Sequence, residues 1–340
     1  MHIARSLLPL LFAGMAMPLL AQVPAPTAIG TVEDVNRRGQ QFRQSGTALQ
    51  EAEQNVPMIN SSEMEDVGPQ FIVKSKPRRH WIEATADAQY YYSDNMFLQE
   101  SSQLGITDTT ILVLTGQFAL APTAFDVGGG KLSPRLGFRQ QTYFYSLQND
   151  DLVNSLNNFD FDAQTAFADL SYLFYETWQA RMGADWTRLI THEKVGNEFY
   201  EEALPRWGLD KFFPFGDKMI FSVSYDGNYH LTSVTPQPMS DINDRTDQSL
   251  TLAWTQQVVR RFIARPYYRF QHTTYINKNL NADDRTDYLN TVGLILSYQF
   301  NDWASVRLFC SYDMKDSDDR TIADYDKFDG GGGATLTFRY

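Results

Sequence analysis

The feature that most constrains this chain is a strict alternation of apolar and polar residues, which starts near residue 81 and recurs to the last residue. In its first occurrence, apolar Ile82, Ala84, Ala86, Ala88, Tyr90 and Tyr92 alternate with polar Glu83, Thr85, Asp87 and Gln89. Successive side chains of a strand point to opposite faces, so the pattern predicts a strand with one apolar and one polar face.

The pattern is found in twelve segments, at residues 82–92, 112–120, 136–144, 159–167, 178–187, 199–211, 219–231, 250–254, 262–271, 292–300, 306–313 and 334–340. Aromatic residues make up 14% of the chain, and its mean hydropathy is -0.39. No stretch beyond the N-terminus approaches the ~20 apolar residues of a spanning helix. These properties predict an all-β fold, a transmembrane antiparallel β-barrel of about twelve strands.

A soluble β-sandwich is the alternative for such strands, since it would bury the apolar faces between two sheets. Tryptophans near the predicted strand ends favour the membrane barrel, because amphipathic rings gather at membrane interfaces. They are Trp178, Trp186, Trp207, Trp254 and Trp303.

The connections between the predicted strands differ in length in a regular way. Long polar connections cover residues 93–109, 148–158, 232–245, 276–285 and 315–326, whereas residues 213–218, 260–261 and 301–302 form short turns. Outer-membrane barrels have long extracellular loops and short periplasmic turns. With an even number of strands, both ends of the barrel are then periplasmic.

Three parts are predicted along the chain. Residues 1–21 form a signal peptide, because an apolar run interrupted by Pro9 and Pro18 ends at Ala21. Residues 22–80 form a periplasmic extension or linker, partly disordered, in which residues 31–53 are compatible with either one helix capped by Thr31 or a disordered segment. Residues 81–340 form the barrel.

A basic cluster at residues 74–79 is interpreted as a solvated linker, with contact to anionic lipid as the alternative.

Chemistry of an enzyme is not expected from this sequence. The formal net charge of -12 and the one cysteine, Cys310, argue against a nucleic-acid partner and against disulfides or multi-cysteine metal sites. The histidines form no metal-binding pair, and His192 with Asp185 is the candidate for a protease-like dyad. The acidic loop at residues 316–319 is read as solvated rather than as a Ca²⁺ site. We therefore predict no catalytic residue, no metal and no cofactor.

The polar faces of the strands supply the candidate functional residues, because charges that line a lumen set the selectivity of channels. The candidates are Arg135, Arg139, Arg181, Arg265, Arg269, Arg307, Asp185 and Asp226; Glu83, Asp87, Asp160 and Asp162 are placed on the same inward faces. The alternative is that these charges pair with one another and fill a narrow barrel.

The end of the chain resembles the last strand of bacterial outer-membrane proteins, in which alternating apolar residues and a final aromatic are read by the barrel-assembly machinery. Here Ala334, Leu336, Phe338 and Tyr340 alternate, and Phe338 and Tyr340 are the predicted sorting signal. Residues 90–98, with the sequence YYYSDNMFL, resemble a stretch near the first strand of outer-membrane β-barrel porins, including those encoded near exopolysaccharide genes.

The resemblance implies an outer-membrane location, with lipid, lipopolysaccharide and the barrel-assembly machinery as partners. The predicted function is a porin-like passive channel for small or anionic solutes, saccharides among them. The alternative is a non-conducting structural or assembly barrel of the envelope.

Overall fold

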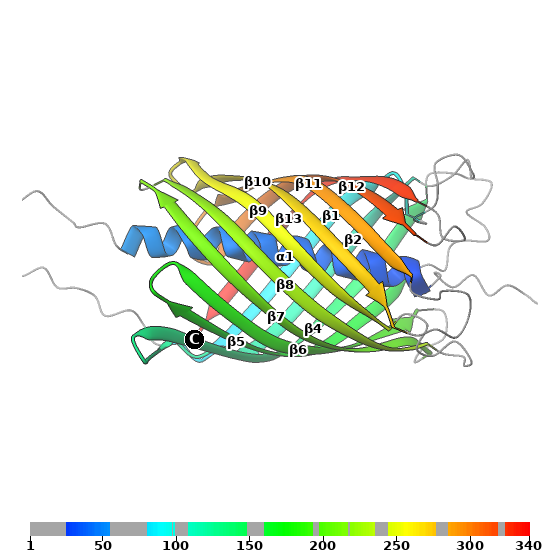
Figure 1. Ribbon diagram of the computed structural model, residues 1–340, viewed down its shortest axis with the longest axis horizontal. Coiled ribbons are helices and arrows are strands. Elements are labelled where there is room, and N and C mark those ends of the chain that lie inside the picture. Colours follow the sequence, from blue (N-terminus) through cyan, green and yellow to red (C-terminus); the bar gives the residue numbers. More distant parts are fainter. Residues whose placement is uncertain are drawn as a thin grey trace, which may run out of the picture.

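The computed structural model describes residues 25–54, 80–96, 98, 108–147, 160–192, 197–216, 218–234, 244–276, 285–318 and 324–340. Within them, antiparallel strands close into one barrel around a long helix (Figure 1). The strands are β1 (Ile82–Ser93), β2 (Thr109–Leu120), β3 (Phe125–Val127), β4 (Gly130–Leu147), β5 (Phe161–Phe174), β6 (Trp178–Thr191), β7 (Glu198–Phe215), β8 (Met219–Val234), β9 (Arg245–Val259), β10 (Phe262–Tyr275), β11 (Thr286–Gln299), β12 (Ala304–Ser317) and β13 (Tyr325–Arg339).

Twelve of these strands form a continuous ring, which confirms the predicted fold class. β1 pairs with both β2 and β13, and β2 pairs with β4, so the ring has no free edge. The short β3 lies outside the ring and pairs with the start of β4 through a turn at Gly128 and Gly129. Both glycines have positive φ, of 57° and 82°, a conformation that favours residues without a Cβ.

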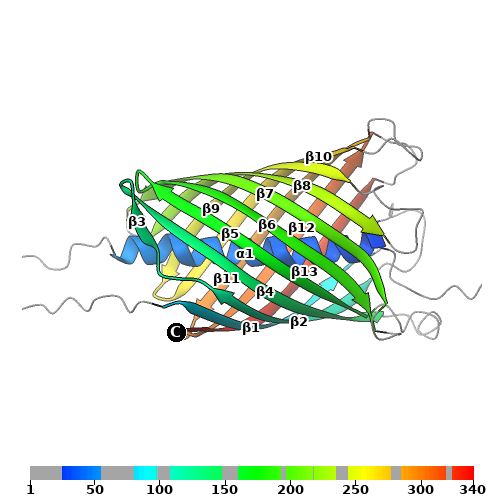
Figure 2. The same ribbon diagram turned by 90° about the horizontal axis from the view of Figure 1, so that it is seen from below.

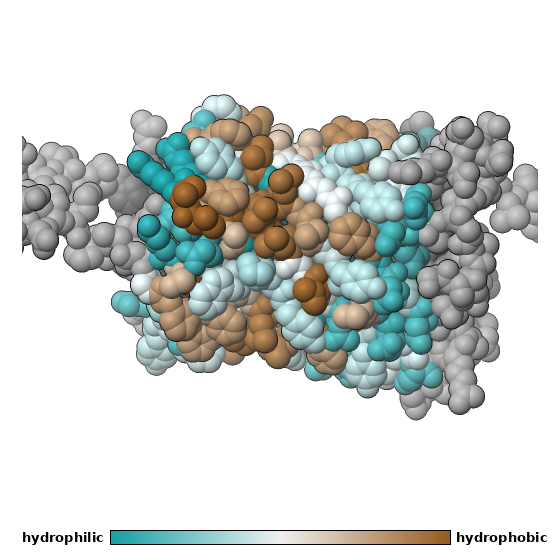
Figure 3. Space-filling model, turned by 90° about the horizontal axis from the view of Figure 1, so that it is seen from above, coloured by the Kyte–Doolittle hydropathy of each residue, from teal (hydrophilic) through white to brown (hydrophobic). Residues whose placement is uncertain are grey.

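The outer surface of the barrel is apolar around its middle. Figure 3 shows brown and pale residues there, with teal polar residues toward both ends. Exposed side chains on it include Leu114, Phe118, Leu136, Phe138, Met182, Val292 and Leu308. A closed barrel satisfies every ladder hydrogen bond internally, and an apolar belt of this kind needs lipid around it. This architecture places the protein in the bacterial outer membrane.

Helix α1 (Ala25–Gln54) runs along the barrel axis, inside the lumen, in two perpendicular views (Figures 1 and 2). Its 30 residues correspond to about 45 Å at 1.5 Å per residue, which exceeds the height of about 35 Å that tilted 14-residue strands give. Thr27 and Gly30 lie beside Ser93 and Asn95, at the end of the barrel with the long connections. The helix therefore enters at that end and leads toward the short turns.

The location of this helix corrects the sequence-based expectation. Residues 25–54 were expected in the periplasm, in an extension that is partly disordered, and they instead lie within the barrel. The helix starts at Ala25 rather than Thr31, and the Thr31 hydroxyl donates to the Thr27 carbonyl inside it. Pro26 fits the first turn, where no backbone N–H is required. The predicted signal peptide and the basic cluster lie outside the described residues.

Among the described residues, no helix is both long and apolar enough to span a bilayer. The polar composition of α1 instead suits the interior of this barrel. More polar and charged residues than apolar residues are buried in the described structure, which is the reverse of a soluble core.

Candidate functional site

The lumen holds the candidate site, and its upper part, toward the long connections, begins with an apolar contact. Ala28, Ile29, Val32 and Val35 of α1 share one stripe at helical spacing and are at most 6% exposed. They belong to one buried cluster with wall residues that include Tyr91, Ile111, Tyr143 and Phe161. This contact seats the first turns of α1 against β1, β2, β4 and β5.

Three charged residues of α1 meet three charged residues of the wall in what we call the latch cluster: Asp34, Arg37, Arg38, Asp313, Lys327 and Asp329. Arg37 lies 3.3 Å from Asp313, Arg38 lies 3.3 Å from Asp329, and Lys327 contacts Asp34. The Arg38 guanidinium also lies 4.2 Å from the centroid of the Tyr91 ring. Cations and carboxylates are equal in number here, as buried charges require.

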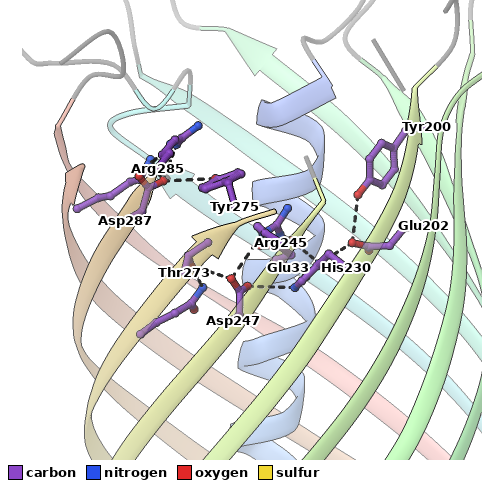
Figure 4. Close-up of polar contacts among 12 residues, drawn as sticks. Glu33, Tyr200, Glu202, His230, Arg245, Asp247, Thr273, Tyr275, Arg285 and Asp287 are labelled. Carbon is purple, nitrogen blue, oxygen red and sulfur yellow. Dashed lines mark hydrogen bonds and ion pairs between the residues drawn. The ribbon is translucent and has the colours of Figure 1, made fainter. Parts of the chain in front are cut away.

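A second group, the histidine cluster, consists of Glu33, Glu202, His230, Arg245 and Asp247 (Figure 4). His230 Nδ1 lies 2.6 Å from Glu202 and its Nε2 lies 3.0 Å from Asp247. Arg245 contacts Glu33 of the helix. The close-up shows His230 between the two wall carboxylates, with Arg245 directed at the helix. The cluster joins α1 to β7, β8 and β9.

Two sets of potential metal ligands occur in these clusters. They are Glu33, Glu202 and His230 in one, and Asp34, Asp313 and Asp329 in the other. In the first set Glu33 contacts Arg245 and Glu202 contacts His230. In the second set all three carboxylates contact Lys327. The arrangement is that of ion-pair networks, in which the protein's own cations occupy the space between the acids.

The predicted lumen arginines all lie on inward faces, and several of them are paired with wall carboxylates. Arg135 lies 2.5 Å from Glu83, and Arg307 lies 2.6 Å from Asp87. Arg181 lies 2.6 Å from Asp210 and 2.8 Å from Asp226. The predicted Asp185 lies 2.7 Å from Arg206. These pairs run around the wall, and helix α1 occupies the lumen between them (Figure 1).

The remaining arginine candidates have a different environment. Arg265 donates to Thr255 at 3.0 Å and to Gln41 of α1 at 3.1 Å. Arg269 lies on the same face of β10. Arg139 of β4 is 9% exposed, and two of its buried N–H groups have no acceptor among the described residues. Their role in selectivity stays a prediction.

Two inward assignments are wrong. Asp160 and Asp162 lie outside the lumen, because β5 turns Phe161, Ala163 and Phe167 inward instead. Phe161 stacks on Tyr143 with ring centroids 4.5 Å apart, inside the buried cluster. Asp162 sits near the rim, above the apolar belt, and accepts from Thr142 at 2.7 Å.

The protease-like dyad of His192 and Asp185 does not form. His192 Nε2 lies 3.1 Å from Asp162, whereas Asp185 faces Arg206 inside the lumen. Sequence reasoning also missed Glu202, Arg206 and Asp210, which the weak alternation of residues 199–211 did not place on a face. Assigning every second residue from Tyr200 onward to the inward face of the strand would have found them.

The predicted sorting residues close the barrel. The carbonyl of Tyr340 accepts from the N–H groups of Trp81 and Ile82 at 2.6 and 3.0 Å. The ring of Phe338 stacks on Trp303 with centroids 6.1 Å apart. Phe338 is 39% exposed and Tyr340 is 72% exposed, both on the outer face.

Comparison with known proteins identifies structural neighbours only. No protein family and no curated protein matches the chain. The COG4313 outer membrane channel from Pseudomonas putida F1 is 10% identical, over 79% of this chain and 100% of that chain, with a TM-score of 0.49. The NanC porin is 8% identical, over 74% and 98%, with a TM-score of 0.42. The KdgM porin in complex with disordered oligogalacturonate is 9% identical, over 75% and 99%, with a TM-score of 0.37. At these values the likeness concerns the barrel fold alone.

Proposed function

We propose that this chain is a porin-like channel for small anionic solutes and that α1 closes it in the conformation described above. The observation that carries the proposal is the charged lumen, in which a polar helix is held through ion pairs with the wall. Such contacts can be exchanged for water, so a helix held by them can leave the lumen as a removable plug. Lipid and lipopolysaccharide around the apolar belt are proposed partners.

The solute class follows from the arginines of the wall. Guanidinium groups bind carboxylates and phosphates in a bidentate manner, and Arg265 and Arg269 line one inward face of β10. The resemblance of residues 90–98 to porins encoded near exopolysaccharide genes supports acidic saccharides as members of this class. The competing proposal, a non-conducting structural or assembly barrel, needs α1 to stay in place permanently.

Breaking the latch cluster should open the channel. In the triple variant Asp34→Asn, Arg37→Gln and Arg38→Gln, α1 loses its charged contacts with β12 and β13, while Lys327 keeps Asp329 at 3.4 Å and Asp313 at 3.6 Å. A hydrogen bond to a charged group contributes about 1.5–3 kcal/mol. We therefore expect the open fraction in planar bilayers to rise at least tenfold over that of the wild type.

The matched control is Arg188→Gln, since Arg188 bonds Gln164 at 2.8 Å on the outer side of the wall. This variant should conduct as the wild type does. If neither the wild type nor the triple variant forms a channel at any applied voltage, the function is not conduction and the structural alternative replaces it.

Selectivity should depend on Arg265 and Arg269. In the latch-cluster variant, replacing both by Ala should move the reversal potential in a salt gradient toward cation preference, because fixed charges are focused by a low-dielectric wall. The shift should shrink at ~1 M salt, where the screening length is about 3 Å. An unchanged reversal potential would show that these arginines do not select the ion, and Arg188→Ala provides the baseline.

A further inference from the structure

A small chamber lies between α1 and the wall formed by β2, β4, β5, β6 and β7, apart from the two clusters that hold the helix. Asn36, Gln40 and Arg43 of α1 line it on one side. Their spacing of four and three residues puts them on one face of the helix. Arg135, Arg139 and Arg206 line it on the wall side. We call this space the arginine chamber.

In the lining of the arginine chamber, guanidinium groups outnumber carboxylates. Four guanidinium groups line it, against the carboxylates of Asp169 and Asp185. Both carboxylates contact Arg206, and Arg135 is engaged by Glu83 behind the chamber. Neither carboxylate forms an ion pair with Arg139, which both influence only at longer range.

Arg139 is the side chain that this imbalance affects most. It is 9% exposed, and its Nε and Nη2 atoms are buried without an acceptor among the described residues. A guanidinium is always protonated in proteins, and an uncompensated buried charge costs several kcal/mol. A buried donor pair that faces a polar cavity is therefore best explained by a ligand that accepts from it.

The chemistry of the lining defines that ligand. Guanidinium forks match the paired oxygens of an oxyanion, and the amides of Asn36 and Gln40 add neutral donors from the helix. The chamber is narrow and lies between the helix and the wall, so it suits an ion rather than a sugar ring.

We propose that the arginine chamber binds a small oxyanion of the phosphate or carboxylate class, which bridges α1 to the barrel wall. The bound anion contacts Arg139 and Arg135 on the wall and Arg43 on the helix, and it compensates the buried positive charge. Because it touches both elements, it also holds α1 in the lumen. This site does not depend on whether the barrel conducts.

The test is calorimetric titration of inorganic phosphate into the full-length protein, folded in detergent at constant ionic strength and low chloride. The wild type should bind phosphate saturably at one site. Arg139→Gln should weaken binding at least tenfold, and Arg139→Lys, which keeps the charge but loses the fork, should fall between the two. Arg188→Gln, outside the lumen, should bind as the wild type does.

The helix side is tested by Arg43→Gln, a change in α1 that leaves the strand ladders intact. It should weaken phosphate binding several-fold, and it also covers the case in which Arg139→Gln fails to fold. Absence of saturable binding by the wild type would overturn the proposal. Wild-type affinity in a folded Arg139→Gln variant, or in Arg43→Gln, would do so as well. Either result leaves the conductance experiments unaffected, so failure of the site and failure of the channel are separate outcomes.

Discussion

An epitope inserted between Val23 and Pro24 should be recognised by antibody on intact cells. The described helix begins at Ala25, beside Ser93 and Asn95, at the end of the barrel with the long connections. Long connections are extracellular in outer-membrane barrels. The N-terminal side of α1 is therefore expected at the cell surface, and its C-terminal end on the periplasmic side, from which β1 starts. The expected contrast between intact and permeabilised cells is nearly all-or-none.

Three further probes make this result interpretable. An epitope inserted between Gln54 and Asn55 should be detected only after permeabilisation. In a Cys310→Ser background, Ser317→Cys should be labelled from outside and Gly216→Cys only from within, which sets the direction of the barrel. If Ser317→Cys is labelled from outside but the epitope between Val23 and Pro24 is not recognised on intact cells, the result would contradict the path of α1. The reverse labelling of the two cysteines would invert the barrel.

The strands could be predicted because a membrane barrel imposes a period of two on every segment that crosses lipid. From β6 to β13, the residues that the alternation predicts to face lipid, such as Met182, Trp254 and Leu308, point outward in the structure. The lumen arginines followed from the same alternation. The pattern works because lipid tolerates few polar side chains on the outer face.

The pattern misled where β5 directs aromatic rings into the lumen. Phe161 and Phe167 look like lipid-facing residues, yet they point inward, toward Tyr143 and Arg135 respectively. The polar residues that alternate with them lie near the rim, beyond the apolar belt. A face assignment from alternation alone cannot separate these cases, because it presumes a polar lumen and an apolar exterior along the whole strand.

The position of α1 could not be predicted from its own sequence. A helix without a wide apolar face looks like a solvated one, and the features that suit it to a lumen are its matched charges with the wall. Lys327 and Asp329 are nearly 300 positions from Asp34 and Arg38, so their pairing appears only in three dimensions. A local signal existed in the stripe of Ile29, Val32 and Val35, which is too narrow for a soluble core.

Deleting Phe338 to Tyr340 should abolish accumulation of the barrel in the outer membrane. The deleted residues pair with the start of β1, where Ala84 faces Phe338 and the Tyr340 carbonyl accepts from Trp81 and Ile82. Without them the seam exposes unpaired backbone groups at the membrane, each costing several kcal/mol. We expect little or no heat-modifiable barrel in outer-membrane fractions, and failure of the purified chain to refold in detergent.

Tyr340→Asp separates closure of the barrel from recognition of its last strand. This substitution keeps the backbone of the seam, and its side chain is 72% exposed, near the interface, where a charge on the outer face costs only about 0–1 kcal/mol. The purified variant should therefore refold as the wild type does. If the barrel-assembly machinery reads the final aromatic, as we propose, the same variant should nevertheless be largely lost from the outer membrane in cells. Tyr340→Phe, which keeps the ring, should accumulate normally. Normal outer-membrane yield of Tyr340→Asp would refute recognition of the Tyr340 side chain. The role of the seam in closing the barrel would still be tested by the deletion of residues 338–340.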